Sequence, residues 1–156
     1  DLALILQPPP SAELHLLYSG HQTLCALMRS GHPLAAEAGP VRLRDCLAHA
    51  LALPDHSLAI RHHIEQALAR RGVELRPAVE SGSLEFLRNL TLREDVVSLQ
   101  VPSGIPEDRR LHSRPIDTRD LTPMTLVLAQ LRGRSLSVAA AKFADQLVVR
   151  LNREAA

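Results

Sequence analysis

Residues 51–106 read LALPDHSLAIRHHIEQALARRGVELRPAVESGSLEFLRNLTLREDVVSLQVPSGIP, and this stretch decides the fold. Two short apolar runs each lead into a polar turn that opens an amphipathic helix, and the turns are 54–57 (PDHS) and 80–83 (ESGS). A third apolar run, Val96–Val101, ends in the turn 102–106 (PSGIP). Repeated strand-turn-helix units predict an α/β fold with a mainly parallel sheet. Such sheets bind ligands just outside the carboxyl ends of their strands, so the polar turns are the first candidates for function.

Apolar runs and helix signals predict the other elements of the chain. The run Leu2–Leu6 is continuous, as in a strand that is buried on both faces. Ser57 and Ser83 stand where helix N-caps are expected, and Gly72 stands where the first of the two helices should stop. The expected strands are 2–6, 14–18, 23–28, 51–53, 75–79, 96–101, 112–116 and 125–131, and the expected helices are 43–50, 57–71, 137–152 and a segment that begins at Ser83.

Composition and charge argue against several classes of function. The 156 residues include 18 Lys plus Arg and 17 Asp plus Glu, so a net charge of +1 gives no general attraction to nucleic acid or to a membrane surface. Tyr18, Phe86 and Phe143 are too few aromatic residues for a surface that stacks single-stranded bases. No apolar run approaches the roughly 20 residues that span a bilayer. Cys25 and Cys46 form no CxxC pair and are typical of reduced thiols in a cytosolic protein, with a redox switch as the alternative.

Motifs for metal, cofactor and nucleophilic chemistry are missing or incomplete. Among the eight histidines, His62 and His63 are adjacent on a predicted helix, so they point about 100° apart and cannot easily share a tetrahedral metal site. No GxGxxG and no Walker A pattern is present. Ser83 follows Gly82 at a strand-to-helix turn, but the ESGSL context lacks the second glycine of a hydrolase elbow. The sequence predicts no catalytic residues, no metal site and no cofactor.

The two predicted caps are the strongest candidates for binding chemistry. Ser57 and Ser83 each follow an apolar run, so each is expected at a helix N-terminus on the ligand side of a sheet. Free backbone N–H groups and a hydroxyl at such a position can hold an anion without a lysine or arginine. As single residues both are better explained as ordinary caps, and a shared crevice would favour the functional interpretation.

The order of several segments resembles the effector-binding domain of LysR-type transcriptional regulators. The matching segments are DLAL (1–4), HPLA (32–35), LRD (43–45), GVELRPAVESGSLEFLRNLTLRED (72–95), VPSGIP (101–106) and LVLAQLRGRSLSVAAAKFADQL (126–147). They cover nearly the whole chain in the right order. One departure is that Arg93-Glu94-Asp95 replaces the small glycine cluster of the family before the Val96 strand.

The resemblance implies a two-lobed, periplasmic-binding-protein-like (type 2) α/β domain whose first lobe is incomplete. Lobe I would comprise 1–17 and 122–156, and lobe II would comprise 18–121. The chain starts inside a strand, so we read it as a fragment that lacks the family's helix-turn-helix and the first strand, helix and second strand of the effector domain. We expect no specific DNA binding by this chain alone, a cytoplasmic location and a homodimer.

The resemblance also implies a small effector, often an organic anion, in the cleft between the lobes. The part of that site present in this chain is expected at the turns after the strands of lobe II. The expected effector-binding residues are His56, Ser57, Ser81, Gly82, Ser83, Ser103 and Ile105.

Two other classes of protein stay open at this point. A solute-binding module of a transporter would share the fold without controlling DNA, and a signal peptide upstream of Asp1 would identify it, as a helix-turn-helix would identify a regulator. A hydrolase is the third possibility, and turnover of a generic ester by the purified protein would reveal it.

Overall fold

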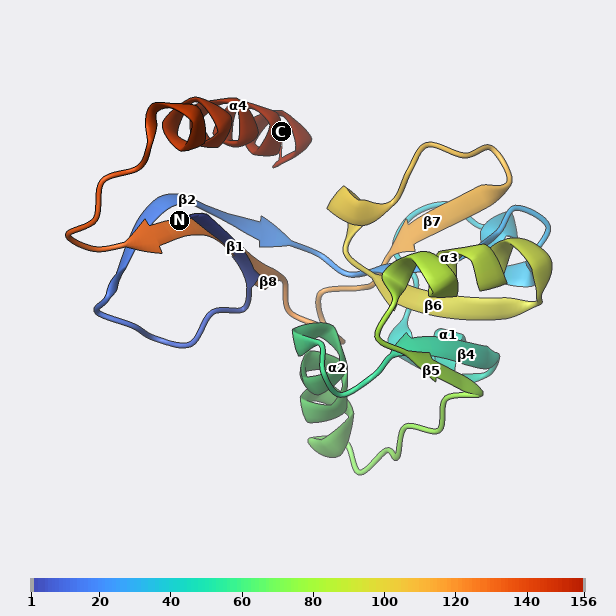
Figure 1. Ribbon diagram of the computed structural model, residues 1–156. Coiled ribbons are helices and arrows are strands. Elements are labelled where there is room, and N and C mark those ends of the chain that lie inside the picture. Colours follow the sequence, from blue (N-terminus) through green and yellow to red (C-terminus); the bar gives the residue numbers. More distant parts are fainter. Residues whose placement is uncertain (1, 156) are drawn as a thin grey trace. The chain divides into compact units, whose positions relative to one another are not determined.

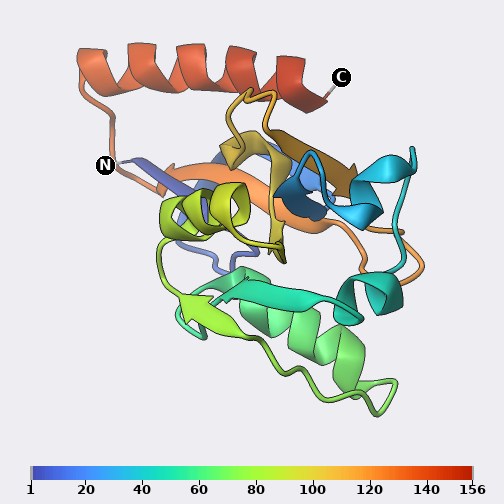
Figure 2. The same cartoon turned by 90° about the vertical axis from the view of Figure 1, so that its right-hand side faces the viewer.

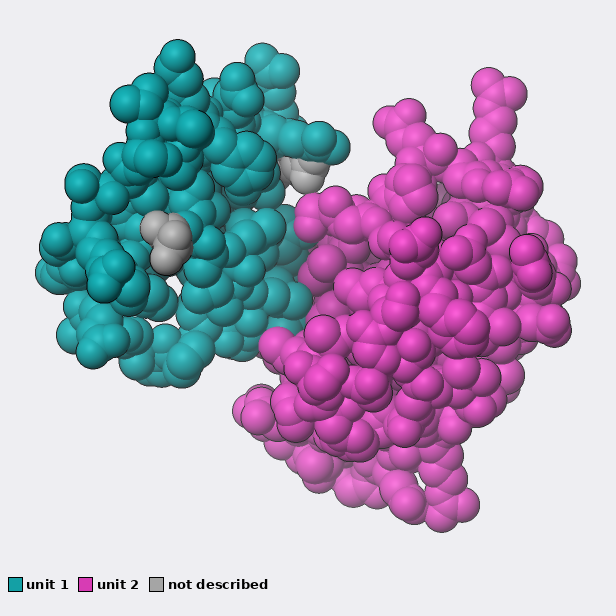
Figure 3. All heavy atoms as spheres, viewed as in Figure 1, with its two compact units in different colours: residues 1–22, 124–156 teal, residues 23–123 magenta. Residues whose placement is uncertain are grey.

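A computed structural model describes residues 2–155 of the chain. Asp1 and Ala156, which the sequence assigns to lobe I, lie outside the described residues. Contacts within the chain define two compact units: unit 1 is Asp1–Gln22 with Met124–Ala156, and unit 2 is Thr23–Pro123 (Figure 3). The four runs 2–6, 125–131, 75–79 and 96–101 were expected in two sheets. The first two lie in one sheet and 96–101 contributes to another, as expected, whereas only Val79 of the run 75–79 lies in a strand of that second sheet.

Unit 1 is a three-stranded antiparallel sheet with one helix packed against it (Figure 1). The strand order is β1-β8-β2, and the elements are β1 (Leu2–Leu6), β2 (Leu14–Gln22), β8 (Met124–Leu131) and α4 (Val138–Ala155). Leu128 of β8 and Leu151 of α4 belong to its buried core. Tyr18, where the sequence places the first lobe boundary, lies inside β2.

Two expectations for unit 1 are wrong. The strand β1 is not buried on both faces, since Leu4 is 52% exposed, and β1 lies at the edge of the sheet, where it pairs only with β8. An apolar run therefore does not distinguish an edge strand from a central one. The apolar spacing of Val138, Ala141, Leu147, Val148 and Leu151 predicts that Val138 lies on the buried side of the last helix. Val138 is instead 75% exposed, and α4 begins at this residue.

Unit 2 contains a five-stranded mixed sheet in the order β5-β4-β6-β3-β7. Its strands are β3 (Cys25–Arg29), β4 (Ala50–Pro54), β5 (Val79–Ser81), β6 (Val96–Gln100) and β7 (Leu111–Pro115). Pairs β4–β5 and β4–β6 are parallel, whereas β3 pairs antiparallel with β6 and β7. The expectation of a mainly parallel sheet is thus correct only for β4, β5 and β6, which are joined through helices. Parallel neighbours need a crossover connection of this kind.

The helices of unit 2 are α1 (Leu43–Leu47), α2 (Ala59–Ala69) and α3 (Leu84–Arg93), with short 3-10 turns η1 (Pro33–Ala36) and η2 (Pro102–Gly104). The chain runs from β4 through α2 to β5 on one side of β4, then through α3 back to β6 on the other side. Right-handed crossovers in opposite directions place their helices on opposite faces of the sheet. Figures 1 and 2 show α2 and α3 on opposite sides of β4.

The connection between α2 and β5 differs from the predicted strand 75–79. Gly72 follows the end of α2 with a φ of 67°, which agrees with the predicted stop. Residues 73–77 that follow are irregular, and β5 begins only at Val79. Pro77 has no N–H to donate to a ladder, so pairing with β4 starts after it.

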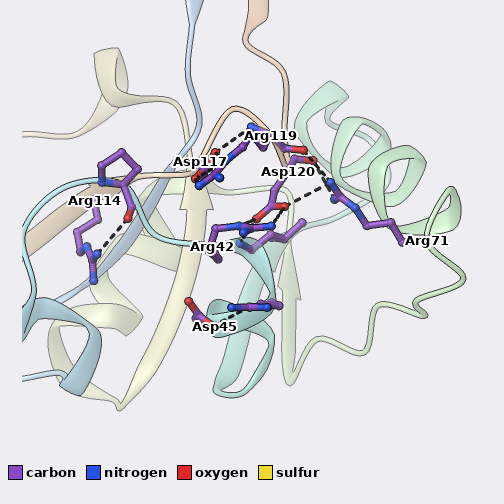
Figure 4. Close-up of polar contacts among 10 residues, drawn as sticks. Arg42, Asp45, Arg71, Arg114, Asp117, Arg119 and Asp120 are labelled. Atoms are coloured by element: carbon purple, nitrogen blue, oxygen red, sulfur yellow. Dashed lines mark hydrogen bonds and ion pairs between the residues drawn. The ribbon is translucent and has the colours of Figure 1, made fainter.

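A buried carboxylate fastens the segment that follows β7 to two helices of unit 2 (Figure 4). Asp120 is 8% exposed, and its two oxygens accept hydrogen bonds from the Arg42 guanidinium at 2.7 and 2.8 Å. The backbone N–H of Leu43, at the start of α1, donates to the same carboxylate at 2.9 Å. Arg71, just beyond α2, lies 3.3 Å from it and donates to the Asp120 carbonyl at 3.1 Å. The hydrogen bond from Arg42 lowers the pKa of Asp120, so the carboxylate is charged at neutral pH.

Replacing Asp120 should destabilise the protein strongly. Asp120→Ala leaves the Arg42 guanidinium and the Leu43 N–H without their acceptor and removes the ion pair to Arg71, and we expect a loss of about 2–4 kcal/mol in the free energy of unfolding. Urea denaturation measures this loss. The matched control is Glu74→Ala, which removes an ion pair to Arg76 between side chains that are 73% and 82% exposed, and it should have little effect. Equal stability of the two variants would contradict the role given to Asp120.

One histidine of unit 2 is buried in its neutral form. His32 is 2% exposed, and its Nδ1 accepts the Leu34 N–H at 3.1 Å, which caps η1. No hydrogen-bond partner for Nε2 is found among the described residues, and the Asp95 carboxylate is 3.9 Å away. Burial, together with the neighbouring His49, lowers the pKa of His32 below its ordinary value. Protonation of Nδ1 would also remove the cap.

His32 should make folding sensitive to acid. Because the folded pKa lies below the unfolded one, the unfolded chain takes up this proton first, and stability is lost as pH falls below 6.5. The loss attributable to His32 is up to about 1.4 kcal/mol per pH unit. In His32→Asn the amide oxygen can still accept the Leu34 N–H, so denaturation between about pH 7.5 and pH 5.5 should show a weaker pH dependence. His15→Asn, at an exposed site on β2, is the control. An unchanged slope in His32→Asn would contradict this account.

Candidate functional site

Polar turns follow three neighbouring parallel strands of unit 2. Because β5, β4 and β6 are adjacent and parallel, their carboxyl ends meet at one edge of the sheet. The turn 55–57 leaves β4 towards α2, and the turn 82–83 leaves β5 towards α3 on the opposite face. Adjacent strands whose connections go to opposite faces form a topological switch point, where open α/β sheets bind ligands.

Backbone pairing and a glycine bring the two turns at the switch point together. Pro54 pairs with Ser81 in the parallel ladder, and the Asp55 N–H donates to the Ser81 carbonyl at 3.1 Å. A Cβ atom added to Gly82 would lie 3.1 Å from Asp55 Oδ2 and 3.7 Å from Ser57 Oγ. Asp55, Ser57, Ser81, Gly82 and Ser83 therefore form one group, which we call the switch-point cluster.

The two serines on the β5 side of the cluster organise the start of α3. Ser83 is its N-cap, as predicted, and the Ser83 Oγ accepts the Phe86 N–H at 3.2 Å. The Ser81 Oγ accepts the Ser83 N–H at 3.1 Å. Each hydroxyl acts as an acceptor in these bonds, so each retains its own O–H for a ligand. Ser83 is exposed and Ser81 is partly exposed, which leaves both accessible.

The predicted role of Ser57 as a cap of α2 is wrong. The helix begins at Ala59, and the residue at its N-cap is Leu58, which provides no side-chain hydrogen bond. The Ser57 N–H and O–H instead donate to Asp55 Oδ1 at 2.9 and 2.6 Å. These bonds lower the pKa of Asp55 and keep it ionised. The donors expected to hold an anion at this turn are thus already used by a carboxylate.

Asp55 is the member of the cluster that sequence reasoning missed. An aspartate whose side chain accepts a hydrogen bond from the backbone two residues later is a common turn motif. The spacing of Asp55 and Ser57 in PDHS matches it. The sequence therefore contains the signal for a turn closed by Asp55, but Ser57 also fits the pattern of a helix cap. Only the position of the first helical residue distinguishes the turn from the cap.

His56 is bound to α2 and not to a member of the cluster. Its Nε2 lies 2.9 Å from Glu65 Oε1, and its side chain is 60% exposed. Glu65 also accepts from Arg61 at 2.6 Å, and the buried Arg61 side chain contacts Glu80 and donates to the Pro54 carbonyl at 3.3 Å. This ion network lies beneath the turn and supports the end of β4.

Ser103 and Ile105 follow the third parallel strand, but they belong to different surroundings. Ser103 lies in η2, and the carbonyl of the next residue, Gly104, accepts a hydrogen bond from Arg88 of α3. Ile105 lines a separate open hollow of about 260 Å³ together with Leu27, Pro102, Pro106, Glu107, Asp108, Leu111 and Ser113. Among the described residues, no hydrogen bond joins Ser103 or Ile105 to the switch-point cluster.

The described residues show no metal site, no reactive thiol and no membrane-spanning helix. Within residues 2–155, no group of three or more His, Cys, Asp or Glu side chains is arranged to hold a metal ion. Cys25 and Cys46 are free and buried, and burial raises the pKa of Cys46 to about 12 and that of Cys25 in the same direction. Protonated buried thiols react slowly, which argues against a redox switch. No helix in the described part is both long and apolar enough to cross a membrane.

These features define a class of protein. Two compact units with one sheet each, a chain that passes from the first unit to the second and back, and a polar switch point are the features of a periplasmic-binding-protein-like (type 2) ligand-binding domain. The family model of the LysR substrate binding domain matches residues 1–151. The chain therefore belongs to this family, the effector-sensing part of LysR-type transcriptional regulators.

Individual relatives agree with this assignment. The HTH-type transcriptional regulator BbuR of Bordetella bronchiseptica is 29% identical over 107 residues, which is 69% of this chain and 33% of BbuR. The chain thus spans about a third of the length of this relative. The regulatory domain of CcmR from Synechocystis PCC6803, in complex with 2-PG, matches 96% of this chain and 72% of its own with a TM-score of 0.72 and 21% identity. The effector binding domain of QuiR, in complex with shikimate, matches 99% and 72% with a TM-score of 0.72 and 16% identity, and both likenesses show the fold.

Ser83 and Ser57 should differ in their effect on stability. Ser83→Ala removes the cap of α3, and we expect the free energy of unfolding to fall by about 1 kcal/mol. Ser57→Ala removes an exposed hydrogen bond within a turn and no cap, so its loss should be smaller. Urea denaturation of both variants measures the difference, and a larger loss for Ser57→Ala would contradict the assigned caps.

Proposed function

We propose that this chain senses a small organic anion, part of which binds at the switch-point cluster of unit 2. The observation that carries the proposal is the switch point itself, where the β4 and β5 connections diverge beside Ser81 and Ser83. Family membership supports effector sensing, because the domain is the ligand-binding part of LysR-type regulators. The relatives CcmR and QuiR, whose structures contain 2-PG and shikimate, support a small molecule as the ligand.

An anionic group is favoured at the β5 side of the cluster. The Ser81 and Ser83 hydroxyls each retain a donor, and they lie at the N-terminal end of α3, where backbone N–H groups point out of the helix. The positive end of the helix dipole favours a negative charge at this place. We therefore assign Ser81, Gly82 and Ser83 to anion binding, and keep His56, Ser103 and Ile105 as outer contacts.

The readout of binding is also a proposal. In a LysR-type regulator, a helix-turn-helix part of the protein contacts DNA, and the name of BbuR and its greater length support such a part here. We propose that this chain binds no specific DNA by itself, acts as a homodimer and works in the cytoplasm. A ligand that binds one conformation of the domain more tightly than another would increase the fraction of protein in that conformation. The DNA-binding part of the regulator would then respond to this change.

Two alternatives receive less support. A transporter's solute-binding module would share the fold, but the family match is to the domain of transcription regulators. Hydrolysis at Ser83 would need a general base within hydrogen-bond reach of the hydroxyl. Among residues 2–155, the recorded partner of Ser83 Oγ is the Phe86 N–H, and no histidine or carboxylate contacts it.

Ligand screening tests the anion assignment. Thermal-shift screening of carboxylic and phosphoric acids should identify binders, and calorimetry should then show that Ser83→Ala binds them several-fold to about a hundredfold more weakly. The control is Ser135→Ala, which replaces an exposed serine of unit 1 outside the proposed site and should leave the affinity unchanged. Because the cap is lost too, the Ser83→Ala protein must be folded at the assay temperature. Unchanged affinity in a folded Ser83→Ala variant would remove this residue from the site.

A further inference from the structure

We propose that Asp55 selects effectors that carry a hydrogen-bond donor, a hydroxyl or an ammonium group, beside their acid group. This inference rests on the proposed function and specifies its ligand. It follows from the fact that the two sides of the switch-point cluster offer opposite hydrogen-bonding chemistry.

The Asp55 carboxylate uses only one of its oxygens within the chain. Oδ1 accepts both the N–H and the O–H of Ser57, at 2.9 and 2.6 Å. Within the described residues, Oδ2 accepts no hydrogen bond. The buried Arg61 side chain donates to Glu65, Glu80 and the Pro54 carbonyl, and no hydrogen bond joins it to Asp55 within the described residues. A charged oxygen with room for two further hydrogen bonds is therefore left for a partner from outside the chain.

Gly82 keeps the space in front of this oxygen open. A Cβ atom at Gly82 would lie 3.1 Å from Asp55 Oδ2, which is tighter than almost all real contacts of that type. The same atom would lie 3.7 Å from the Ser57 oxygen, whose proton is already donated to Asp55. The two side-chain oxygens that face Gly82, Asp55 Oδ2 and Ser57 Oγ, are thus both placed as acceptors, and the charge on Asp55 disfavours a bare anion beside them.

The β5 turn presents the complementary groups. The Ser81 and Ser83 hydroxyls accept hydrogen bonds from backbone N–H groups and keep their own protons available. Gly82 lies between these two serines in the chain and against Asp55 in space. A ligand that spans the cluster would place an acid oxygen on the serines and a donor on Asp55. Hydroxy acids and amino acids meet both requirements, whereas an acid without a donor satisfies only the serines.

The ammonium form should gain the most, because it also neutralises the carboxylate. Charge-assisted hydrogen bonds are about twice as strong as neutral ones. The pKa of Asp55 is lowered, chiefly by the Ser57 hydroxyl, so the carboxylate is available throughout the neutral range.

Matched acids test the inference by calorimetry. The ligands are carboxylic acids of three to six carbons. At each chain length, three acids are compared that differ only in the group at the second carbon, which is hydrogen, hydroxyl or ammonium, as in succinate, malate and aspartate. We expect the preferred acids to bind about 10–100-fold more tightly with the donor than without it. Asp55→Asn, which keeps an acceptor for Ser57, should reduce the preference for ammonium about tenfold or more and leave the donor-free acid unweakened.

Two control variants separate the possible failures. Ser57→Ala keeps the carboxylate and should retain the donor preference, whereas Ser83→Ala should weaken all three acids alike. If acids bind and Ser83→Ala weakens them, but the donor makes no difference, the role of Asp55 is refuted and the anion site stands. If simple amines bind and no acid does, the anion site is refuted. If neither acids nor amines bind, both proposals fail.

Discussion

The buried carboxylate of Asp120 is the interaction on which the arrangement of unit 2 depends. It joins the start of α1, through Arg42 and the Leu43 N–H, to the end of α2, through Arg71. The segment that carries it also leads from β7 towards β8, and His63 of α2 binds its Thr122 carbonyl at 2.8 Å. Burying a charge is favourable only when its partners are all in place. One residue in a connecting segment therefore determines where two helices can sit.

The sequence predicts the existence of most elements but not their neighbours. Seven of the eight expected strands overlap substantially with observed ones, because apolar runs bounded by turn residues report burial directly. The eighth, 75–79, fails because Pro77 prevents pairing. Pairing direction is a different matter. Leu2–Leu6 and Thr23–Met28 look like parallel core strands, yet both pair antiparallel, since that choice depends on where distant segments such as Met124–Leu131 and Leu111–Pro115 return.

The candidate site shows the same division. The position of the serine turns at one edge of the sheet follows from strand-turn-helix order alone, and Ser83 is the cap that its pattern predicts. The sequence does not decide whether Ser57 caps a helix or closes a turn on Asp55, because both use the same residues and the outcome depends on where α2 begins. The two outcomes differ in their chemistry. A turn in which Ser57 caps the helix would bind an anion, whereas a turn closed on Asp55 would bind a hydrogen-bond donor.

The β4 turn is positioned by what lies beneath it and not by its own loop. Buried Arg61 binds the Pro54 carbonyl and the carboxylates of Glu65 and Glu80, which fixes the end of β4 to α2 and to β5. The other end of α2 is fixed by Arg71 at Asp120. A helix held at both ends presents Asp55 and Ser57 in one geometry, and such preorganisation reduces the cost of ordering a site when a ligand arrives. The geometry that the proposed selectivity of Asp55 requires is thus held by two ion clusters, one around Arg61 and one around Asp120.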